Sequence, residues 1–517
     1  MEDPTTQKHI PVAVEGQATQ KENVQEIEVV GMPEGNVDYK NWWHQPNLRR
    51  MNLLMGFPLL SIFTLGFDGS MMNGLQAVEG WRSYFGEPKG ATLGLFNAAY
   101  SIGGLIGIPL ISRLNDTFGR RKGIAIGAVI CIIGAALQAA AQNIAMFVVS
   151  RGILGIGAAL IQASGAPLIT EIAHPHQRAT ATALFNTSYA LGSIIAAWIT
   201  FGTFRLDSTW SWRIPSLLQG SPSMVQLLGI FFVPESPRWL ISRGRDQEAL
   251  DMLAKYHGEG DANDPLVQFE FNEIRQTFLI DNENASGKFL TKYLEFAKTP
   301  GNRKRFFLLT WCACISQMSG NGFVSYYLSP ILAQVGLTST LQQTLINATS
   351  QMFSWLTSVY VATLPAKLGR RTLFLWSLLA VFFVLGAIAT GNGLFTTNGD
   401  KGAGIAVVVF IYIFSGVYNL GLGPNLSLYV TEIVPFSLRL RGMAVFQFWT
   451  LGFIMFSTFA IPVGLDGIGW KLYPIFMGWV VVEWVVVWFT FPETKGPTLE
   501  EIAVIFDGPK AIGKADV

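Results

Sequence analysis

Residues 53–75 read LLMGFPLLSIFTLGFDGSMMNGL, and this mainly apolar run is long enough to cross a lipid bilayer. Late in the run lies Asp68, with no Lys or Arg beside it in the sequence. A carboxylate at that depth costs about 2.5–3.5 kcal/mol on insertion scales, so such groups usually face a polar cavity, pair with another helix or bind a proton. A wet Asp near the outer interface is the alternative. The only Lys or Arg well inside another span is Arg151, and we ask whether both residues serve one site.

The composition is that of a protein surrounded by lipid. Of the 517 residues, 50% are apolar and 14% are charged, whereas a soluble protein carries about 25% charged residues. The net charge of +1 gives no sign of a nucleic-acid partner. Cys131, Cys312 and Cys314 all lie in apolar segments, which favours buried thiols over disulfides or metal ligands. We find no metal cluster, nucleotide loop or nucleophile–base pair, so neither a cofactor nor an enzyme is expected.

Twelve stretches are long and apolar enough to span a bilayer. They are 52–74, 91–112, 123–141, 144–167, 181–202, 213–233, 306–328, 341–364, 372–391, 403–430, 442–463 and 471–491. The sequence therefore predicts an all-α membrane protein. We expect a disordered tail over 1–50, six-helix bundles over 51–233 and 306–492, a linker over 234–305 and a tail over 493–517. In the linker, 245–256 and 267–281 have the apolar spacing of surface helices.

The positive charges orient the spans. With both termini in the cytoplasm, six of the 36 Lys and Arg residues fall in the outer loops and outer span ends. Those six are Arg82, Lys89, Arg205, Arg213, Lys401 and Lys471. Because cytoplasmic loops carry the excess of Lys and Arg, this orientation is the expected one. We expect a multi-pass protein of the cell membrane; a vacuolar membrane is the alternative.

The two halves of the chain repeat each other. Three motif pairs recur in the same order at a separation of about 250–260 residues: 116–121 with 366–371, 170–172 with 431–433, and 234–236 with 492–494. Such internal repeats are typical of alternating-access transporters. The sequence thus predicts two pseudo-symmetric bundles.

The repeated motifs suggest an inner gate. Arg120 and Arg370 follow tight glycine turns at the cytoplasmic face, where Glu171 and Glu432 are available as partners. Pairs of this kind would hold the gate shut and break on opening, although any inner loop carries Arg for topology alone. The candidate gate residues are Asp116, Arg120, Arg121, Glu171, Arg178, Glu235, Arg238, Arg370, Arg371, Glu432 and Arg441. Ala366 replaces the acid of the first motif, so the second should be less charged.

These motifs resemble those of the sugar porter family of the major facilitator superfamily. The specific strings are Pro234-Glu235-Ser236-Pro237-Arg238-Trp239-Leu240 and Pro492-Glu493-Thr494-Lys495-Gly496. The resemblance covers nearly all of 50–505 and implies the major facilitator fold. Residues 316–322 and 467–471 are most similar to the fungal lactose-permease-type branch.

The resemblance also implies proton coupling. Asp68 matches the first-helix Asp of the proton-coupled members, and Arg151 matches the fourth-helix Arg that pairs with it. Counting about 1.5 Å per residue from the span ends places both in the outer half of the bilayer, so a salt bridge between them is expected. Protonation of Asp68 would release Arg151 and let the outer half close.

A sugar site needs neutral polar groups and an aromatic face, because unpaired buried charge is costly. Span seven offers Gln317, Asn321, Tyr326 and Tyr327, although Asn321 lies one place before the family Asn. By resemblance, Asn186 and Asn347 are further candidates. Ser427 stands where hexose carriers often have Trp, which suggests a roomier pocket. Gln162, Asn425 and Trp449 are weaker candidates. The alternative for each amide is an interhelical hydrogen bond.

We therefore expect a proton-coupled sugar symporter, with a lean to a disaccharide such as lactose or cellobiose. Its partners would be sugar, proton and lipid bilayer, and we expect a monomer. A uniporting hexose facilitator, an exporter of a sugar-like metabolite and a non-transporting sugar sensor are the alternatives. Glu483 lies in the middle of the twelfth span without an assigned role. We expect it at a rim or interface, with a second titrating group as the alternative.

Overall fold

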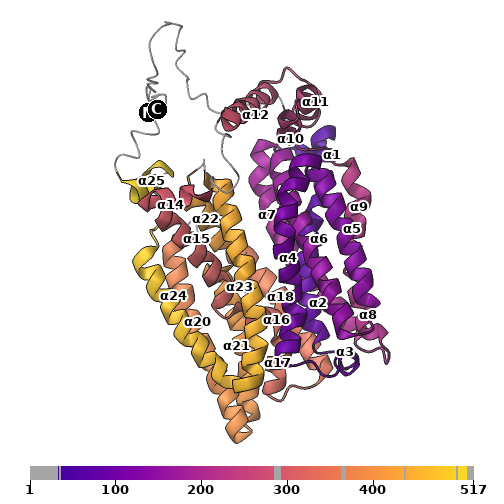
Figure 1. The fold of residues 1–517 in the computed structure, drawn as a ribbon, viewed down its shortest axis with the longest axis vertical. Coiled ribbons are helices and arrows are strands. Elements are labelled where there is room, and N and C mark those ends of the chain that lie inside the picture. Colours follow the sequence, from indigo (N-terminus) through magenta and orange to yellow (C-terminus); the bar gives the residue numbers. More distant parts are fainter. Residues whose placement is uncertain are drawn as a thin grey trace.

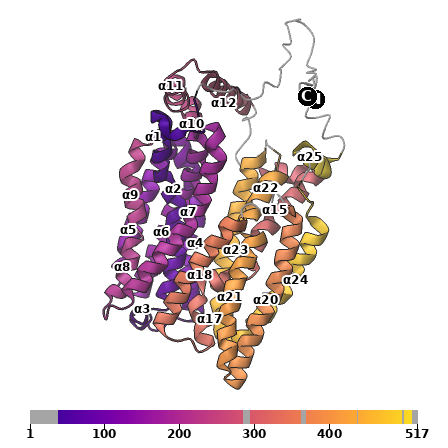
Figure 2. The ribbon, with the colours of Figure 1, turned by 180° about the vertical axis from the view of Figure 1, so that it is seen from behind.

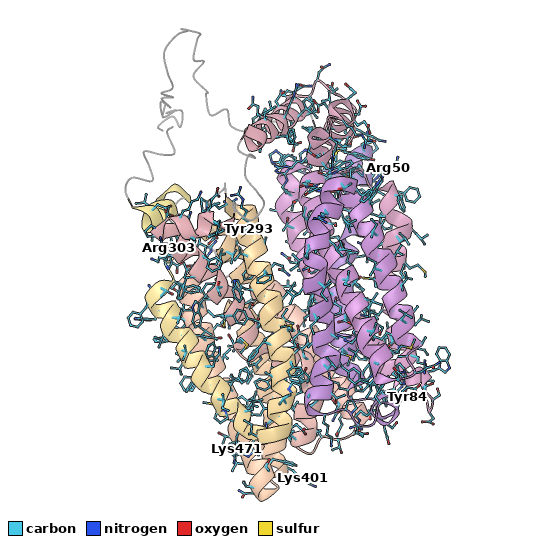
Figure 3. All side chains as sticks on the ribbon, in the orientation of Figure 1. Arg50, Tyr84, Tyr293, Arg303, Lys401 and Lys471 are labelled. Carbon is cyan, nitrogen blue, oxygen red and sulfur yellow. The ribbon has the colours of Figure 1, made fainter. Side chains whose placement is uncertain are left out.

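The computed structural model describes residues 33, 37–283, 293–361, 368–435, 438–495 and 499–508. Within these ranges the elements are α-helices and short 3-10 helices, without strands. The helices form two bundles that stand side by side, with short helices packed over one end (Figures 1 and 2). We call this end the linker face and the other end the opposite face. Arg50 and Arg303 lie at the linker face, and Lys401 and Lys471 lie at the opposite face (Figure 3).

The first bundle begins with the short α1 (Pro46–Leu54), which continues into α2 (Gly56–Leu75) as one span, and its later long helices alternate in direction. These later helices are α4 (Gly90–Phe118), α5 (Arg120–Ala139), α6 (Ile144–Ile172) and α7 (Arg178–Thr203), with α3 (Glu79–Tyr84) between α2 and α4. The sixth expected span is broken into α8 (Trp210–Leu218) and α9 (Ser221–Gly229). Within the range 1–50, which was expected to be a disordered tail, residues 42–44 form the 3-10 helix η1 (Trp42–His44) and α1 begins at Pro46.

Glycines let the helices of the first bundle approach closely. A Cβ on Gly155 of α6 would lie 1.9 Å from the Tyr100 carbonyl oxygen of α4. A Cβ on Gly66 of α2 would lie 1.8 Å from the Tyr189 carbonyl oxygen of α7. Close backbone approach through small residues is the usual basis of helix packing in membranes. These contacts bring α6 close to α4 and α2 close to α7.

The second bundle repeats this plan with more breaks. Its helices are α15 (Pro300–Met318), α16 (Asn321–Tyr326), α17 (Leu328–Gln334), α18 (Thr340–Val361), α20 (Arg370–Asn398), α21 (Lys401–Gly421), α22 (Gly423–Ile433), α23 (Arg439–Ile468) and α24 (Leu472–Thr490). The seventh span breaks between α15 and α16, where Gly320 has a φ of +94°. Residues with a Cβ rarely adopt this left-handed conformation, so a glycine suits the break.

The linker face carries short helices. They are α10 (Pro237–Ser242), α11 (Asp246–His257), α12 (Pro265–Glu283), α14 (Glu295–Lys298) and α25 (Leu499–Asp507). The two surface helices expected from apolar spacing correspond to α11 and α12. Ala366 and most of the N-terminal tail lie outside the described residues.

The helices fit a multi-pass membrane protein. Among the described residues, eight helical segments are long and apolar enough to cross a bilayer. Four of them join consecutive elements, namely Pro46–Leu75, Pro175–Thr203, Lys401–Ile433 and Arg441–Thr490. The expected spans 213–233 and 306–328 are broken into shorter helices, which explains part of the difference from twelve. The expected buried thiols are found, since Cys131, Cys312 and Cys314 are buried and unpaired.

Candidate functional site

The structure brings Asp68 and Arg151 together. Arg151 Nη1 donates to Asp68 Oδ1 over 2.9 Å, and Nη2 donates to Oδ2 over 3.2 Å. The two side chains are 5% and 3% exposed, respectively. A bidentate pair of this kind combines charge with a fixed geometry. The alternative of a wet Asp at the interface is wrong, because the carboxylate is buried and faces a guanidinium.

Three further groups hold the pair. Arg151 Nε donates to the Phe96 carbonyl oxygen over 2.5 Å, and the Tyr100 ring centroid lies 5.4 Å from the guanidinium. Gln219, at the end of α8, donates from Nε2 to Asp68 Oδ1 over 2.6 Å. Sequence reasoning missed Gln219, and its polar amide within the apolar sixth span was the available signal. The Asp68 carboxylate therefore accepts three side-chain hydrogen bonds, two from Arg151 and one from Gln219.

Amide side chains join the two bundles toward the opposite face. Asn73 Nδ2 donates to the Val324 carbonyl oxygen over 3.1 Å, and Gln76 Nε2 donates to the Tyr326 carbonyl oxygen over 2.7 Å. Asn97 Nδ2 donates to Tyr327 Oη over 3.2 Å. Among the described residues, the side-chain hydrogen bonds between the bundles all connect residues 70–97 with residues 324–347. The bundles are thus closed against each other at the opposite face.

The expected substrate residues fall into two groups. Tyr327 and Asn347 are buried in contacts between the bundles, where Asn347 Oδ1 lies 3.4 Å from Asn73 Nδ2. Gln317 and Tyr326 are half-buried beside the break in span seven. Asn321 is also half-buried, but its Oδ1 accepts a hydrogen bond from Ser325 over 2.8 Å.

The remaining candidate substrate residues differ in side-chain exposure and hydrogen bonding. Asn186 of α7 and Ser427 of α22 are exposed and make no side-chain hydrogen bond within the described ranges. Gln162 is half-buried, and Trp449 packs 5.9 Å from the Phe453 ring. Asn425 is buried and donates to the Leu420 carbonyl oxygen over 3.1 Å, so it supports the break before α22.

Three tyrosines near the middle of the molecule were only partly foreseen. Tyr189 of α7, Tyr326 of α16 and Tyr418 of α21 come from both bundles and lie near one another. Tyr418 Oη also donates to the Ser316 carbonyl oxygen over 2.6 Å. Tyr189 and Tyr418 were missed because aromatic residues are frequent in every span. Phenols offer both a ring face and a hydrogen-bonding group.

The motifs at the linker face form equivalent contacts in both bundles. Arg120 Nε lies 3.3 Å from Glu171 Oε2, and Arg370 Nη2 lies 2.7 Å from Glu432 Oε1. Arg178 pairs with Glu270 of the linker, and Arg441 pairs with Glu295. Each pair lies within one bundle or joins it to the linker. The gate role of these residues stays a prediction.

The other predicted gate residues lie around these pairs. Arg121 donates to the Val233 carbonyl oxygen over 3.3 Å, and Arg371 donates to the Trp488 carbonyl oxygen over 2.6 Å. The Asp116 and Arg238 side chains are exposed. Asp116 is held through its backbone, because its carbonyl oxygen accepts from Trp239 Nε1 over 3.0 Å.

Two glutamates cap the helices that follow the glycine turns. Glu235 Oε1 accepts from the Arg120 backbone nitrogen over 3.0 Å, and Glu493 Oε1 accepts from the Arg370 backbone nitrogen over 2.8 Å. A carboxylate at a helix N-terminus satisfies donors that the helix leaves free. Burial nevertheless raises the pKa of Glu235, against the lowering effect of these backbone bonds. The repeat predicted from sequence thus recurs as a repeated hydrogen-bonding arrangement.

Glu483 is not at a rim, which corrects the expectation from sequence. Its residue is 0% exposed, on the side of α24 that packs against α15. Ser319 Oγ lies 2.6 Å from Glu483 Oε2. Sequence could not place it, because α24 is apolar on all sides and does not reveal which face packs inward.

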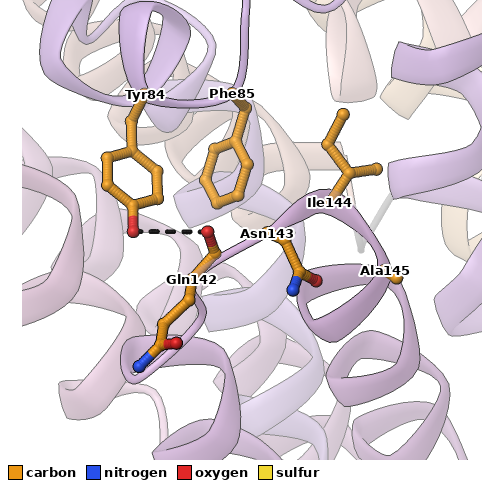
Figure 4. A pocket seen from close by; sticks show the side chains of 6 residues that line it. All are labelled: Tyr84, Phe85, Gln142, Asn143, Ile144 and Ala145. Atoms are coloured by element: carbon orange, nitrogen blue, oxygen red, sulfur yellow. Dashed lines mark hydrogen bonds between the residues drawn. The ribbon is translucent and has the colours of Figure 1, made fainter.

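A surface hollow of about 470 Å³ lies apart from these groups. Tyr84, Phe85, Gln142, Asn143, Ile144 and Ala145 line it (Figure 4). Its residues come from the end of α3 and the residue after it, the start of α6 and the loop before α6, and include none of the predicted substrate residues. This hollow therefore does not represent the predicted site.

Comparison with known proteins gives matches along nearly the whole chain. A family model described as "Sugar (and other) transporter" matches residues 54–506. A high-affinity glucose transporter of Kluyveromyces lactis is 30% identical over 492 residues, covering 90% of this chain and 86% of that protein. An MFS glucose transporter of Aspergillus flavus is also 30% identical, covering 88% of this chain and 89% of that protein.

Solved structures share the fold. The inward-open xylose transporter XylE from E. coli aligns with a TM-score of 0.71 at 22% identity, covering 88% of this chain and 100% of that chain. The proton:xylose symporter XylE of the major facilitator superfamily, bound to 6-bromo-6-deoxy-D-glucose, aligns with a TM-score of 0.69 at 23% identity. This alignment covers 89% of this chain and 100% of the XylE chain.

Proposed function

Because this chain belongs to the sugar transporter family, we propose that it is a proton-coupled symporter that imports a sugar by alternating access. We place it in the cell membrane as a monomer, with the linker face and both termini in the cytoplasm. The positive charges of the loops support this orientation. The observation that carries the proposal is the buried, bidentate pair of Asp68 and Arg151.

The pair supplies a site for the driving proton. An ion pair this deeply buried is stable only while both charges are present, since removing one leaves the other uncompensated. Protonation of Asp68 would free Arg151 and weaken the junction between α2 and α6. The same helix α2 carries Asn73 and Gln76, which hold the bundles together at the opposite face. Proton binding and closure of the outer side are therefore coupled through one helix.

The cargo would bind between the bundles near the break in span seven. Gln317, Asn186 and Ser427 offer neutral polar groups, and the tyrosines at 189, 326 and 418 offer ring faces. The small Ser427 favours a roomy pocket and hence a disaccharide. The relatives from Kluyveromyces lactis and Aspergillus flavus are named as glucose transporters, which favours a hexose as the second candidate.

Purified protein in proteoliposomes tests the proposal. Wild-type protein should accumulate labelled sugar when an inward proton gradient is imposed, with a membrane potential adding about 2.3 kcal/mol per charge per 100 mV. A panel of glucose, xylose, lactose and cellobiose identifies the cargo. Asp68→Asn should lose accumulation but keep sugar exchange, because an amide cannot exchange a proton. Normal accumulation by Asp68→Asn would reject the coupling role, and uptake unaffected by an uncoupler would indicate a facilitator.

A further inference from the structure

The hydroxyl of Ser319 has two close oxygen neighbours. Its Oγ lies 2.6 Å from the Ile315 carbonyl oxygen and 2.6 Å from Glu483 Oε2. A serine hydroxyl carries one proton, and a carbonyl oxygen can only accept. Two oxygen–oxygen contacts this short need two protons. A proton on the Glu483 carboxyl would supply the second one.

The surroundings of Glu483 agree with a neutral acid. The residue is 0% exposed, and no Lys or Arg of the described part of the chain pairs with it. The titratable groups that interact with it are the Cys314 thiol and the Tyr418 phenol, which are ordinarily uncharged near neutral pH. The Trp479 indole faces it from one turn earlier without a hydrogen bond of normal geometry. A carboxylate in such a place would be unpaired and costly.

The contact sits where the seventh span breaks. Ser319 directly follows α15 as its C-cap, and Gly320, with a φ of +94°, begins the turn into α16. Gln317 and Asn321, two of the expected substrate residues, lie on either side. Stacked Trp311 and Trp479 rings, 6.1 Å apart, form a second contact between α15 and α24.

We propose that Glu483 is held as a neutral carboxylic acid that donates a hydrogen bond to Ser319, and that this bond positions the break in span seven for sugar binding. Glu483 is thus a positioning residue, whereas Asp68 is the group that exchanges the driving proton. The sugar-binding part of this inference rests on the proposed function. The protonation of Glu483 does not depend on it.

Infrared difference spectroscopy tests the protonation without any sugar. The wild-type spectrum minus that of Glu483→Gln, near neutral pH, should contain the C=O stretching band of a protonated carboxyl. The corresponding difference for Asp68→Asn should contain carboxylate bands, since Asp68 is paired with Arg151. Carboxylate bands in the Glu483→Gln difference would overturn the proposal. The infrared experiment therefore tests the protonation of Glu483 even if the proposed sugar cargo is wrong.

Sugar exchange tests the positioning. Glu483→Gln keeps a donor for Ser319 Oγ, so its KM for exchange should stay within about twofold of wild type. Glu483→Leu has similar size without a donor, and its KM should rise about tenfold with little change in maximal rate. A monodisperse profile in size-exclusion chromatography confirms that both variants fold. Equal KM values for Gln and Leu would overturn the positioning role. Loss of accumulation with intact exchange in Glu483→Gln would instead make Glu483 a proton-exchanging group, which also contradicts the proposal.

Discussion

Gln76 of the first bundle donates from Nε2 to the backbone carbonyl oxygen of Tyr326 in the second bundle, over 2.7 Å. The amide belongs to α2, the helix that carries Asp68, and the carbonyl belongs to the short α16 that follows the break in span seven. One hydrogen bond therefore links the helix of the proposed proton site to the segment of the proposed sugar site. It exists only when the bundles are closed at the opposite face.

Removing this bond should open the opposite face. Gln76→Ala leaves the Tyr326 carbonyl oxygen without this partner, and a lost buried hydrogen bond costs about 1–3 kcal/mol. About 1.4 kcal/mol changes a population ratio tenfold, so outward-open molecules should become more frequent. Spin labels on cysteines introduced at Glu87 and Lys401 would report longer distances by pulsed EPR. The three native cysteines are buried and should not react.

Ser83→Ala is the matched control for that experiment. Ser83 Oγ donates to the Glu79 carbonyl oxygen over 2.9 Å within α3, near the opposite face but inside one bundle. Its loss should leave the distance distribution unchanged. If both variants gave the wild-type distribution, the hydrogen bond of Gln76 would not contribute to closure.

Replacing Arg151 by lysine should abolish accumulation of sugar. Arg151 uses three nitrogens at once, two toward Asp68 and Nε toward the Phe96 carbonyl oxygen. A lysine ammonium cannot reproduce this planar arrangement, although it keeps the charge. Breaking a buried pair costs about 3–5 kcal/mol, so uptake should fall by two orders of magnitude or more. Arg82→Lys, which alters a pair of 3.9 Å at the surface, is the control. Equal uptake by both variants would show that charge alone suffices.

The family and the fold could be predicted from sequence because their signals are specific. The prediction of a sugar porter with the major facilitator fold is confirmed by the family match and the aligned structures. Asp68 and Arg151 could be paired in advance, since charged residues inside spans are rare and costly. Their contact is present in the structure, whereas their role in coupling stays a prediction.

The neutral partners could not be predicted in the same way. Gln219, Asn73 and Gln76 were missed because amides occur in many spans, and sequence does not say which of them meet across bundles. Glu483 was misplaced because its helix is apolar all round, so that no pattern distinguishes the packed face from the lipid face. A charged side chain inside a membrane span has a high free-energy cost, so its presence points to a partner or a function. A neutral polar side chain has a lower cost, so its presence says less about its role.

A methyl group at Gly155 should destabilise the first bundle. The Cβ of alanine would lie 1.9 Å from the Tyr100 carbonyl oxygen, so α4 and α6 must move apart. Overpacking of this kind costs about 1–3 kcal/mol. Arg151 lies one turn away, and the separation would also disturb its contact with the Tyr100 ring. Gly155→Ala should therefore lower the melting temperature in detergent and reduce uptake.

Gly452→Ala is the control, because it makes the same glycine-to-alanine change at another position in a helix. No atom lies within 4 Å of a Cβ built on Gly452, and alanine in a helix is favoured over glycine by about 0.5–1 kcal/mol. This variant should be as stable as wild type or slightly more stable. A similar loss of stability in both variants would mean that close approach at Gly155 is not what holds α4 against α6.

Acid should loosen the linker from the first bundle through His174. The side chain follows α6 at the linker face and is 1% exposed, with its ring 5.4 Å from that of His257 on α11. Burial, with the nearby His257 adding to it, lowers the pKa of His174 to about 4. Since the unfolded chain has a pKa of about 6.5, the folded state binds this proton more weakly. The stabilisation is complete above about pH 6.5 and is lost as the pH falls toward 4. The melting temperature, and the protection of α11 from hydrogen exchange, should fall between about pH 7 and pH 5.

His174→Phe keeps a ring that cannot be charged and should remove most of this loss. His44→Gln, which alters an exposed histidine, should behave as wild type. If His174→Phe lost as much stability in acid as wild type does, another group would be the one that titrates.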